Sequence, residues 1–287
     1  MGVTPPGASG DDTDAGSTSD GFPRSDDGAL FGKMMRAIRG GHTLGNRIRM
    51  LKLPLILTDS QLYGGAIANF YWLTRALERA LDDPIAQSHP VLAPVRALGL
   101  RLTAGYEKDL AQIFGPRWEA VAAGARTAAT DAYVAEIEQA EPARLVAAAF
   151  ILYGALVIGG GRQTQAKVRK VFSGCDHALY DVADDMSQAR KAFRECFNNI
   201  GERFPEHREV IIRCKCKHTR TLCHMLALRV ILPPHHHARV CREAAEFMQR
   251  NNSVVLSVRC LPTWWWRAVG VAALAIAAAR AWSALRS

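Results

Sequence analysis

Cysteine is missing from the first 174 residues of this 287-residue chain, and all seven cysteines lie between Cys175 and Cys260. The opening segment MGVTPPGASG lacks the basic and apolar stretches of a secretory signal peptide, so we expect a reducing compartment and free thiols. With 23 glycines and 13 prolines, the chain has too little of either for a collagen-like or low-complexity protein. A hydrophobic content of 49% then indicates a globular protein.

Apolar side chains are also scarce in residues 1–28, which contain almost nothing apolar except Phe22. The same segment has six aspartates and a single basic residue, Arg24. Such a segment cannot bury enough surface to offset its chain entropy, so we expect a disordered acidic arm. The whole chain carries 36 Lys and Arg against 27 Asp and Glu, a net charge of +9. This excess suggests an anionic partner: nucleic acid, a membrane surface or an acidic ligand.

Alternating apolar and polar runs long enough for a sheet are absent, and helical periodicity dominates from Ala29 onward. Thr58 or Asp59 is a plausible N-cap for the first clear helix. The sequence therefore predicts an all-α helical domain over residues 29–252, with a possible short strand at Val254–Val258 and a linker over 253–263. The predicted helices are Ser60–Leu81, Arg101–Phe114, 117–138, Ala143–Ile158, Arg162–Phe172, Ser187–Arg203, Glu206–Val230 and His235–Arg250.

Three motifs could suggest a metal site, a nucleic-acid surface and a phosphate loop, but each lacks a feature that such a site requires. Cys214, Cys216, His218, Cys223 and His224 form the densest cluster of potential metal ligands, but two ligands on one helix face do not close a zinc site. Basic residues between 162 and 250 are spread over several helices without an aromatic platform, so we expect no nucleic-acid partner. The run Gly159–Gly161 lacks the Lys-Ser or Lys-Thr of a phosphate loop, which leaves ligand contact and close helix packing as its two interpretations.

Residues 264–285 begin with three tryptophans and contain twelve uncharged residues, Ala268–Ala279, before Arg280 and Trp282. As a helix, 22 residues extend about 33 Å at about 1.5 Å per residue, with tryptophans where the two membrane interfaces would lie. We expect a C-terminal hydrophobic tail helix that anchors the chain in a membrane. The alternative is an Ala-rich core helix, which Arg280 favours.

Four segments occur in an order and spacing that resemble the heme oxygenase family, over roughly residues 30–230. The first is His42-Thr43. The second is YWLTRALE, which ends at Glu78, 36 residues after His42. The third is YEKDL with FGPRW after it, from Tyr106 to Trp118. The last runs from LVA at Leu145 through Tyr153 to Gly159-Gly160.

The resemblance implies an all-α fold that holds heme between a proximal helix and a bent, glycine-rich distal helix. His42 matches the axial ligand of the heme iron, and Asn46 stands where the family commonly has a glutamate. Phe150 stands where the family often has a tyrosine. The heme-binding positions that the resemblance implies are Arg39, His42, Phe150, Gly159, Gly160, Arg190 and Arg194, the arginines being matched to the heme propionates.

The distal helix departs from the family pattern. Where the family reads Gly-Asp-Leu-Ser-Gly-Gly, this chain reads ALVIGG, so Leu156 replaces the aspartate that orders the proton-delivering water, and no catalytic residue is certain. We therefore expect heme to bind but to be degraded slowly or not at all, unless Asp185 or another distant group supplies protons.

The resemblance implies the oxidative cleavage of heme to biliverdin, carbon monoxide and iron, with electrons from NADPH through a cytochrome reductase. It also implies a tail anchor in the endoplasmic reticulum membrane, with the folded domain facing the cytosol. Two alternatives stay open. One is a non-catalytic heme-binding or heme-sensing protein at a membrane, and the other is a helical membrane adaptor with a closed pocket.

Overall fold

The computed structural model describes residues 29–159, 161–205, 243–262 and 265, and every regular element in these ranges is helical. This confirms the all-α prediction. The predicted acidic arm, the Cys/His-rich segment 214–224 and all of 264–285 except Trp265 lie outside the described residues. Within the described ranges, no helix has the length and apolar character needed to cross a membrane.

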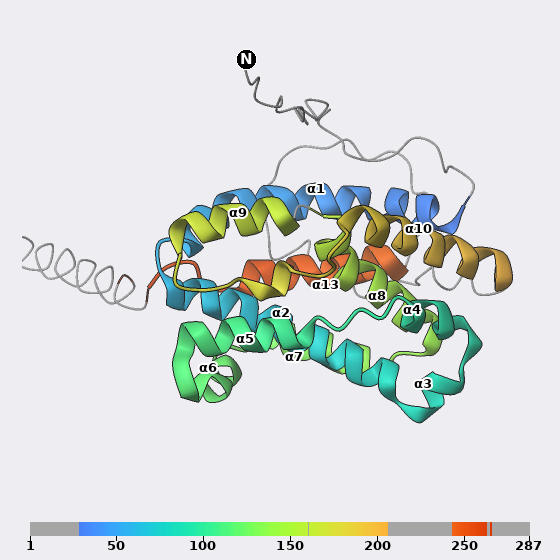
Figure 1. The fold of residues 1–287 in the computed structure, drawn as a ribbon, viewed down its shortest axis with the longest axis horizontal. Coiled ribbons are helices and arrows are strands. Elements are labelled where there is room, and N and C mark those ends of the chain that lie inside the picture. The colour runs from blue at the N-terminus through green and yellow to red at the C-terminus, as the bar shows by residue number, and fades with distance from the viewer. Residues whose placement is uncertain (1–28, 160, 206–242, 263–264, 266–287) are drawn as a thin grey trace, which may run out of the picture.

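Two groups of helices enclose a central pair. Figure 1 shows α1, α9 and α10 along one side of the molecule and α2, α5 and α7 along the other, with α8 and α13 between them. The elements are α1 (Leu30–Ile56), α2 (Ser60–Asp82), α3 (Pro84–Ser88), η1 (Pro90–Leu92), α4 (Ala93–Ala97), α5 (Thr103–Phe114), η2 (Gly115–Arg117), α6 (Trp118–Gly124), α7 (Ala128–Glu138), α8 (Pro142–Val157), α9 (Gly161–Val171), η3 (Ala178–Tyr180), α10 (Met186–Arg203) and α13 (Glu243–Ser257).

The core is built around α8, which begins with Pro142 in its first turn and is buried along most of its length. Its residues are apolar nearly all round the helix, as expected of a segment covered on most sides. Small residues let neighbours approach: Ala147, Ala148 and Ala149 are fully buried. Phe150 packs edge-on against Phe31 of α1, so α8 and α1 share one aromatic cluster.

Two predictions about local structure were wrong. The segment 117–138 is two helices, α6 and α7, because α6 ends at Gly124 and the Thr127 side chain accepts a hydrogen bond from the Thr130 amide as a new N-cap. The segment Val254–Val258 is not a strand. It belongs to α13 and its last turn. Val254 and Val258 lie one helical turn apart, and both are buried on the face toward the core.

The helix α13 therefore includes the first five residues of the predicted linker. Its end is fixed to α1 by Lys52, whose Nζ donates to the carbonyls of Val255 at 2.9 Å, Leu256 at 2.7 Å and Val258 at 2.5 Å. These carbonyls have no helical partner at a C-terminus, and a lysine there satisfies them and complements the helix dipole. This contact joins two walls of the cavity described below.

The start of α5 depends on a carboxylate of α2. Glu78 is 7% exposed, and its Oε1 accepts hydrogen bonds from the amides of Leu102 at 2.6 Å and Thr103 at 3.1 Å. The first amides of a helix have no partner within the helix. Glu78 supplies that partner from another helix and so positions α5 against α2.

We expect Glu78→Ala to lower the free energy of unfolding by about 2 kcal/mol, because it leaves two amides at a buried helix start without an acceptor. Urea denaturation followed by far-UV circular dichroism measures this loss. The matched variant Glu78→Gln keeps a carbonyl oxygen at the same position and is expected to lose less than half as much. Equal losses in the two variants would show that the side-chain oxygen does not hold α5.

Candidate functional site

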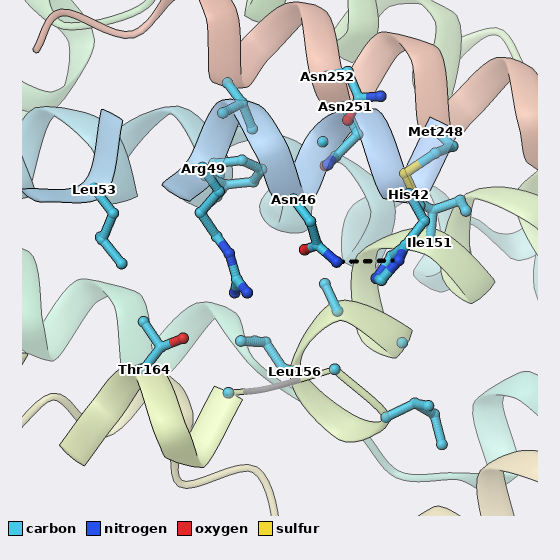
Figure 2. A pocket seen from close by; sticks show the side chains of 18 of the residues that line it. His42, Asn46, Arg49, Leu53, Ile151, Leu156, Thr164, Met248, Asn251 and Asn252 are labelled. Carbon is cyan, nitrogen blue, oxygen red and sulfur yellow. Dashed lines mark hydrogen bonds between the residues drawn. The ribbon is translucent and has the colours of Figure 1, made fainter. Parts of the chain in front are cut away.

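A cavity of about 510 Å³ lies between α1, α2, α8, α9 and α13, within the size range of small-molecule sites. Aliphatic and aromatic side chains make up much of its lining, including Ile38, Phe70, Phe150 and Phe193. Polar side chains reach the lining from α1, α2, α9, η3 and α13. Figure 2 shows His42, Asn46 and Arg49 projecting from α1 on one side, with Leu156 and Thr164 on the opposite side.

His42 lines the cavity from the middle of α1 and is half-buried. Burial lowers the pKa of its imidazole below the ordinary value, and the positive charge of Arg49 lowers that pKa further. Both effects oppose protonation. The ring is therefore neutral at pH 7, and a neutral imidazole is the form that binds metal ions and heme iron.

Asn46 lies one turn after His42, and its Nδ2 is 3.3 Å from His42 Nδ1. In this arrangement the amide donates to Nδ1, so the ring proton is on Nε2. If the amide turns over, Oδ1 accepts from Nδ1–H and the lone pair moves to Nε2. Unlike a glutamate, an asparagine can support either tautomer at this position.

The wall opposite α1 is formed where α8 ends at Val157 and α9 begins at Gly161. A Cβ on Gly159 would collide with the carbonyl oxygen of Ala155, and one on Gly161 would lie 3.0 Å from the carbonyl oxygen of Leu156. Gly159 is thus needed because backbone approaches backbone at this bend, and a side chain at Gly161 would require a small shift of the Leu156 carbonyl. Gly159 also lines the cavity, so its contact with a ligand stays a prediction beside the observed close packing, whereas Gly160 lies outside the described residues.

The charges around the cavity are of one sign. Arg49 and Lys52 line it, and no aspartate or glutamate does so within the part of the chain that the structure describes. Asp185, the alternative proton source, is committed elsewhere, because it caps α10 by accepting from the amides of Ser187 at 2.8 Å and Gln188 at 3.1 Å. The site therefore suits a largely apolar ligand that carries negative charge.

The structure brings only some of the predicted site residues together. His42, Phe150, Leu156 and Gly159 line the same cavity. The three arginines Arg39, Arg190 and Arg194 are not part of its lining. Arg190 Nε donates to the carbonyl of Val157 at 3.2 Å, and the Arg194 guanidinium lies 5.5 Å from the centre of the Phe31 ring.

Arg49, Tyr63 and Tyr180 line the cavity but were not predicted from the sequence. Arg49 was recognisable, because it follows His42 by seven residues, two helical turns, and so shares its face of α1. Tyr63 lies on α2, and Tyr180 lies on the short helix η3 in a connection without periodicity. No sequence pattern brings these two tyrosines to one cavity, because 117 residues separate them in the chain.

We expect Arg49→Met to raise the pKa of His42 toward 6.5, because it removes the positive charge that disfavours the imidazolium. Proton NMR titration of the His42 ring, assigned with His42→Gln, measures the change. The folded pKa is lowered, so below about pH 6.5 the unfolded chain binds more protons and His42 then reduces stability as the pH falls. Arg47→Met, at an exposed position of the same helix, should leave the pKa unchanged; an equal rise there would contradict the assignment.

Comparison with known proteins agrees with this architecture. The family model described as heme oxygenase matches residues 33–216. Heme oxygenase 2 from Chlamydomonas reinhardtii, solved without heme, is 22% identical with a TM-score of 0.63, over 82% of this chain and 99% of that chain. A comparison with the curated proteins gives no match.

Two cyanobacterial structures are also similar in fold. Heme oxygenase-1 from Synechocystis sp. PCC 6803, in complex with heme, is 17% identical with a TM-score of 0.58, over 86% of this chain and 98% of that chain. Heme oxygenase-2 from the same organism, in complex with heme and NO, is 19% identical with a TM-score of 0.57, over 80% and 85%. With a family match over more than half of its length, the chain belongs to the heme oxygenase family.

Proposed function

We propose that this chain binds heme in the cavity between α1 and α8, with His42 as the axial ligand of the iron. The observation that carries the proposal is a neutral imidazole on α1 that faces the bend between α8 and α9 across a mainly apolar cavity. The cations of the lining complement the two negative charges of the propionates. Family membership supports the same ligand.

Within this proposal, the residues of α1 prepare the ligand position. His42 needs the lone pair on Nε2 for iron, so the Asn46 amide turns over and accepts from Nδ1–H. Lys52 donates to three carbonyls at the end of α13, which leaves Arg49 as the cation of the lining that we assign to a propionate. The propionate contacts of Arg39, Arg190 and Arg194 stay a prediction.

We further propose that heme is the substrate of the family's reaction, cleavage to biliverdin, carbon monoxide and iron, with electrons from NADPH through a cytochrome reductase. Bound heme supplies the iron chemistry that activates dioxygen, while the protein orients the macrocycle and controls water and protons. Proton supply is the step that this chain performs differently, because Leu156 occupies the cavity wall where the family has a carboxylate.

The same observation favours a second candidate, a protein that binds or senses heme without degrading it. A leucine cannot order water by hydrogen bonding, and no carboxylate lines the described part of the cavity to replace it. The third interpretation from the sequence, an adaptor with a closed pocket, is disfavoured by a cavity of about 510 Å³.

Titration of the full chain in detergent with hemin tests the proposal. We expect a Soret band that saturates at one equivalent, and His42→Ala is expected to shift this band and to weaken hemin binding at least tenfold, because it removes the iron ligand. His89 is not part of the cavity lining, and His89→Asn retains a side chain able to cap η1, so this variant serves as the matched control and should behave as the natural chain does. An unchanged spectrum for His42→Ala would refute axial ligation by His42.

A single-turnover assay then separates the two candidates. The one-to-one complex is mixed with NADPH and a cytochrome reductase, and the Soret and biliverdin absorbances are followed together. Soret loss matched by biliverdin establishes cleavage without the distal aspartate. A Soret band that persists establishes a heme-binding protein without turnover.

We also propose that residues 264–285 anchor the chain in the endoplasmic reticulum membrane, with the helical domain in the cytosol. The support is the sequence pattern of tryptophans around an uncharged run. We expect the full chain in cells to stay in the membrane pellet at pH 11, whereas a chain ending at Thr263 should appear in the supernatant. Pelleting of the shortened chain would place the membrane contact elsewhere.

A further inference from the structure

Helix α1 has an exposed apolar surface on the side away from the cavity. Leu44, Leu51 and Leu55 are 53%, 76% and 41% exposed, and their spacing of seven and four residues places them in one line along the helix. Met50, which is 63% exposed, lies beside this line. We call these four residues the outer face of α1. They are four of the nine large apolar side chains that are exposed in the described part of the chain.

The other sides of α1 are occupied. One side lines the cavity with His42 and Asn46. A second side packs against α13, where a side chain at Gly45 would collide with Asn252. The outer face belongs to neither set, because Leu44 follows His42 by two residues, which is about 200° around a helix of 3.6 residues per turn. The outer face is therefore nearly opposite to the cavity.

The charges of α1 are of one sign. The helix contains six lysines and arginines and no aspartate or glutamate. Arg47 is exposed at the edge of the outer face, three residues after Leu44. An apolar line with cations beside it is typical of a helix that lies in a membrane interface, where apolar side chains enter the acyl boundary and cations meet anionic headgroups.

The chain leaves the described domain beside the outer face. Lys52 Nζ donates to three backbone carbonyls at the end of α13, the last of them that of Val258, so this end is fixed to the last turns of α1. Figure 1 shows α1 and α13 ending at the same end of the molecule. Leu256, on the last turn of α13, adds another exposed apolar side chain there.

The connection to the proposed anchor is short. Trp264, where the anchor would begin, follows Val258 by six residues, which span at most about 21 Å when fully extended. The Trp265 amide donates to the carbonyl of Pro262 at 3.0 Å, so the chain turns here and its reach is shorter. An anchor that enters a bilayer at this point therefore holds the end of α1 close to the lipid surface.

We propose that the outer face of α1 docks on the surface of the membrane that holds the anchor, an anionic lipid bilayer. This inference rests on the proposed anchor over residues 264–285 and adds a second contact with the same lipid. The four apolar side chains enter the interface, and Arg47 meets lipid phosphates. The cavity then lies on the side of α1 away from the lipid, because His42 is opposite to the outer face.

Photocrosslinking of the full chain in vesicles tests this contact. The photoreactive residue p-benzoylphenylalanine replaces Leu51, and the chain is reconstituted in phosphatidylcholine with about 30% phosphatidylserine and a trace of fluorescent lipid. After illumination, a denaturing gel shows how much labelled lipid is bound covalently to the chain. We expect labelling at position 51 to be at least about fivefold higher than at position 85, because only the outer face enters the interface.

Ile85 is the matched control position, since it is apolar and 78% exposed on α3. Figure 1 shows α3 at the other end of the molecule from the ends of α1 and α13. Leu274, within the uncharged run of the proposed anchor, is the positive control position. Labelling at position 274 reports on the anchor, and labelling at position 51 reports on the outer face, so the two proposals can fail separately.

A charge substitution tests the contact from a second position. With the photoreactive residue in place of Leu55, Leu51→Glu should lower lipid labelling at least about threefold, because an anionic surface repels the new carboxylate. Ile85→Glu is the matched control and should leave this labelling unchanged. Neither Leu51 nor Ile85 belongs to the core or to the cavity lining, so circular dichroism should show the natural helix content in both variants.

Three results would overturn the docking of α1. Equal labelling at positions 51 and 85, with strong labelling at position 274, means that the anchor is in the bilayer and the outer face is not. A crosslink from position 51 to another segment of the chain, or to a second copy, assigns the face to that protein contact. Labelling at position 55 that Leu51→Glu leaves unchanged shows that the apolar line does not make the contact.

Position 274 decides the fate of the anchor. Labelling at position 51 without labelling at position 274 supports the docking of α1 and refutes the anchor. Absence of labelling at both positions refutes both proposals.

Discussion

The close approach of backbone to backbone at the bend between α8 and α9 is the constraint on which the site depends. No side chain fits at Gly159 against the carbonyl of Ala155, so only glycine allows the chain to leave α8 and turn immediately into α9. The bend allows residues on both of its sides, Leu156 before it and Thr164 after it, to line one cavity. A side chain at the bend would separate α8 from α9 and remove the wall that faces His42.

The opposite wall is rigid for a different reason. Lys52 bonds three carbonyls at the end of α13, which fastens α1 to that helix where both line the cavity. The charge of Lys52 is thereby used within the protein. Arg49 lies one turn earlier, and its positive charge adds to burial in lowering the pKa of His42. This guanidinium thus favours the neutral form of the His42 imidazole, which is the form that the proposed heme site requires.

Leu156 gives the wall opposite His42 an apolar surface. Where the family pattern that this chain resembles has a carboxylate, a leucine cannot order water by hydrogen bonding, and no carboxylate lines the described part of the cavity in its place. Proton supply is therefore the point on which the proposed cleavage of heme and the proposed binding without turnover differ.

The sequence by itself determined the helical class, the bounds of α2, α5, α8 and α10 to within about two residues, and His42 and Leu156 as residues of one site. The helical class and the helix bounds follow from periodicity and caps, which act over one or two turns of chain, whereas the pairing of His42 with Leu156 follows from the resemblance to the heme oxygenase family. Sequence periodicity missed the division of 117–138 into α6 and α7, because a three-residue cap interrupts the helix without a proline.

Only the tertiary structure decided which side chains surround the cavity. The predicted arginines Arg190 and Arg194 bond to a helix end and to an aromatic ring outside the lining, while Tyr63 and Tyr180 meet across 117 residues of sequence. The last turn of α13 is helical at Val254 and Val258 because both valines are buried against the core. Helix propensity acts along the chain, but burial and the pairing of buried polar groups are decided by elements distant in sequence, and these set the chemistry of the site.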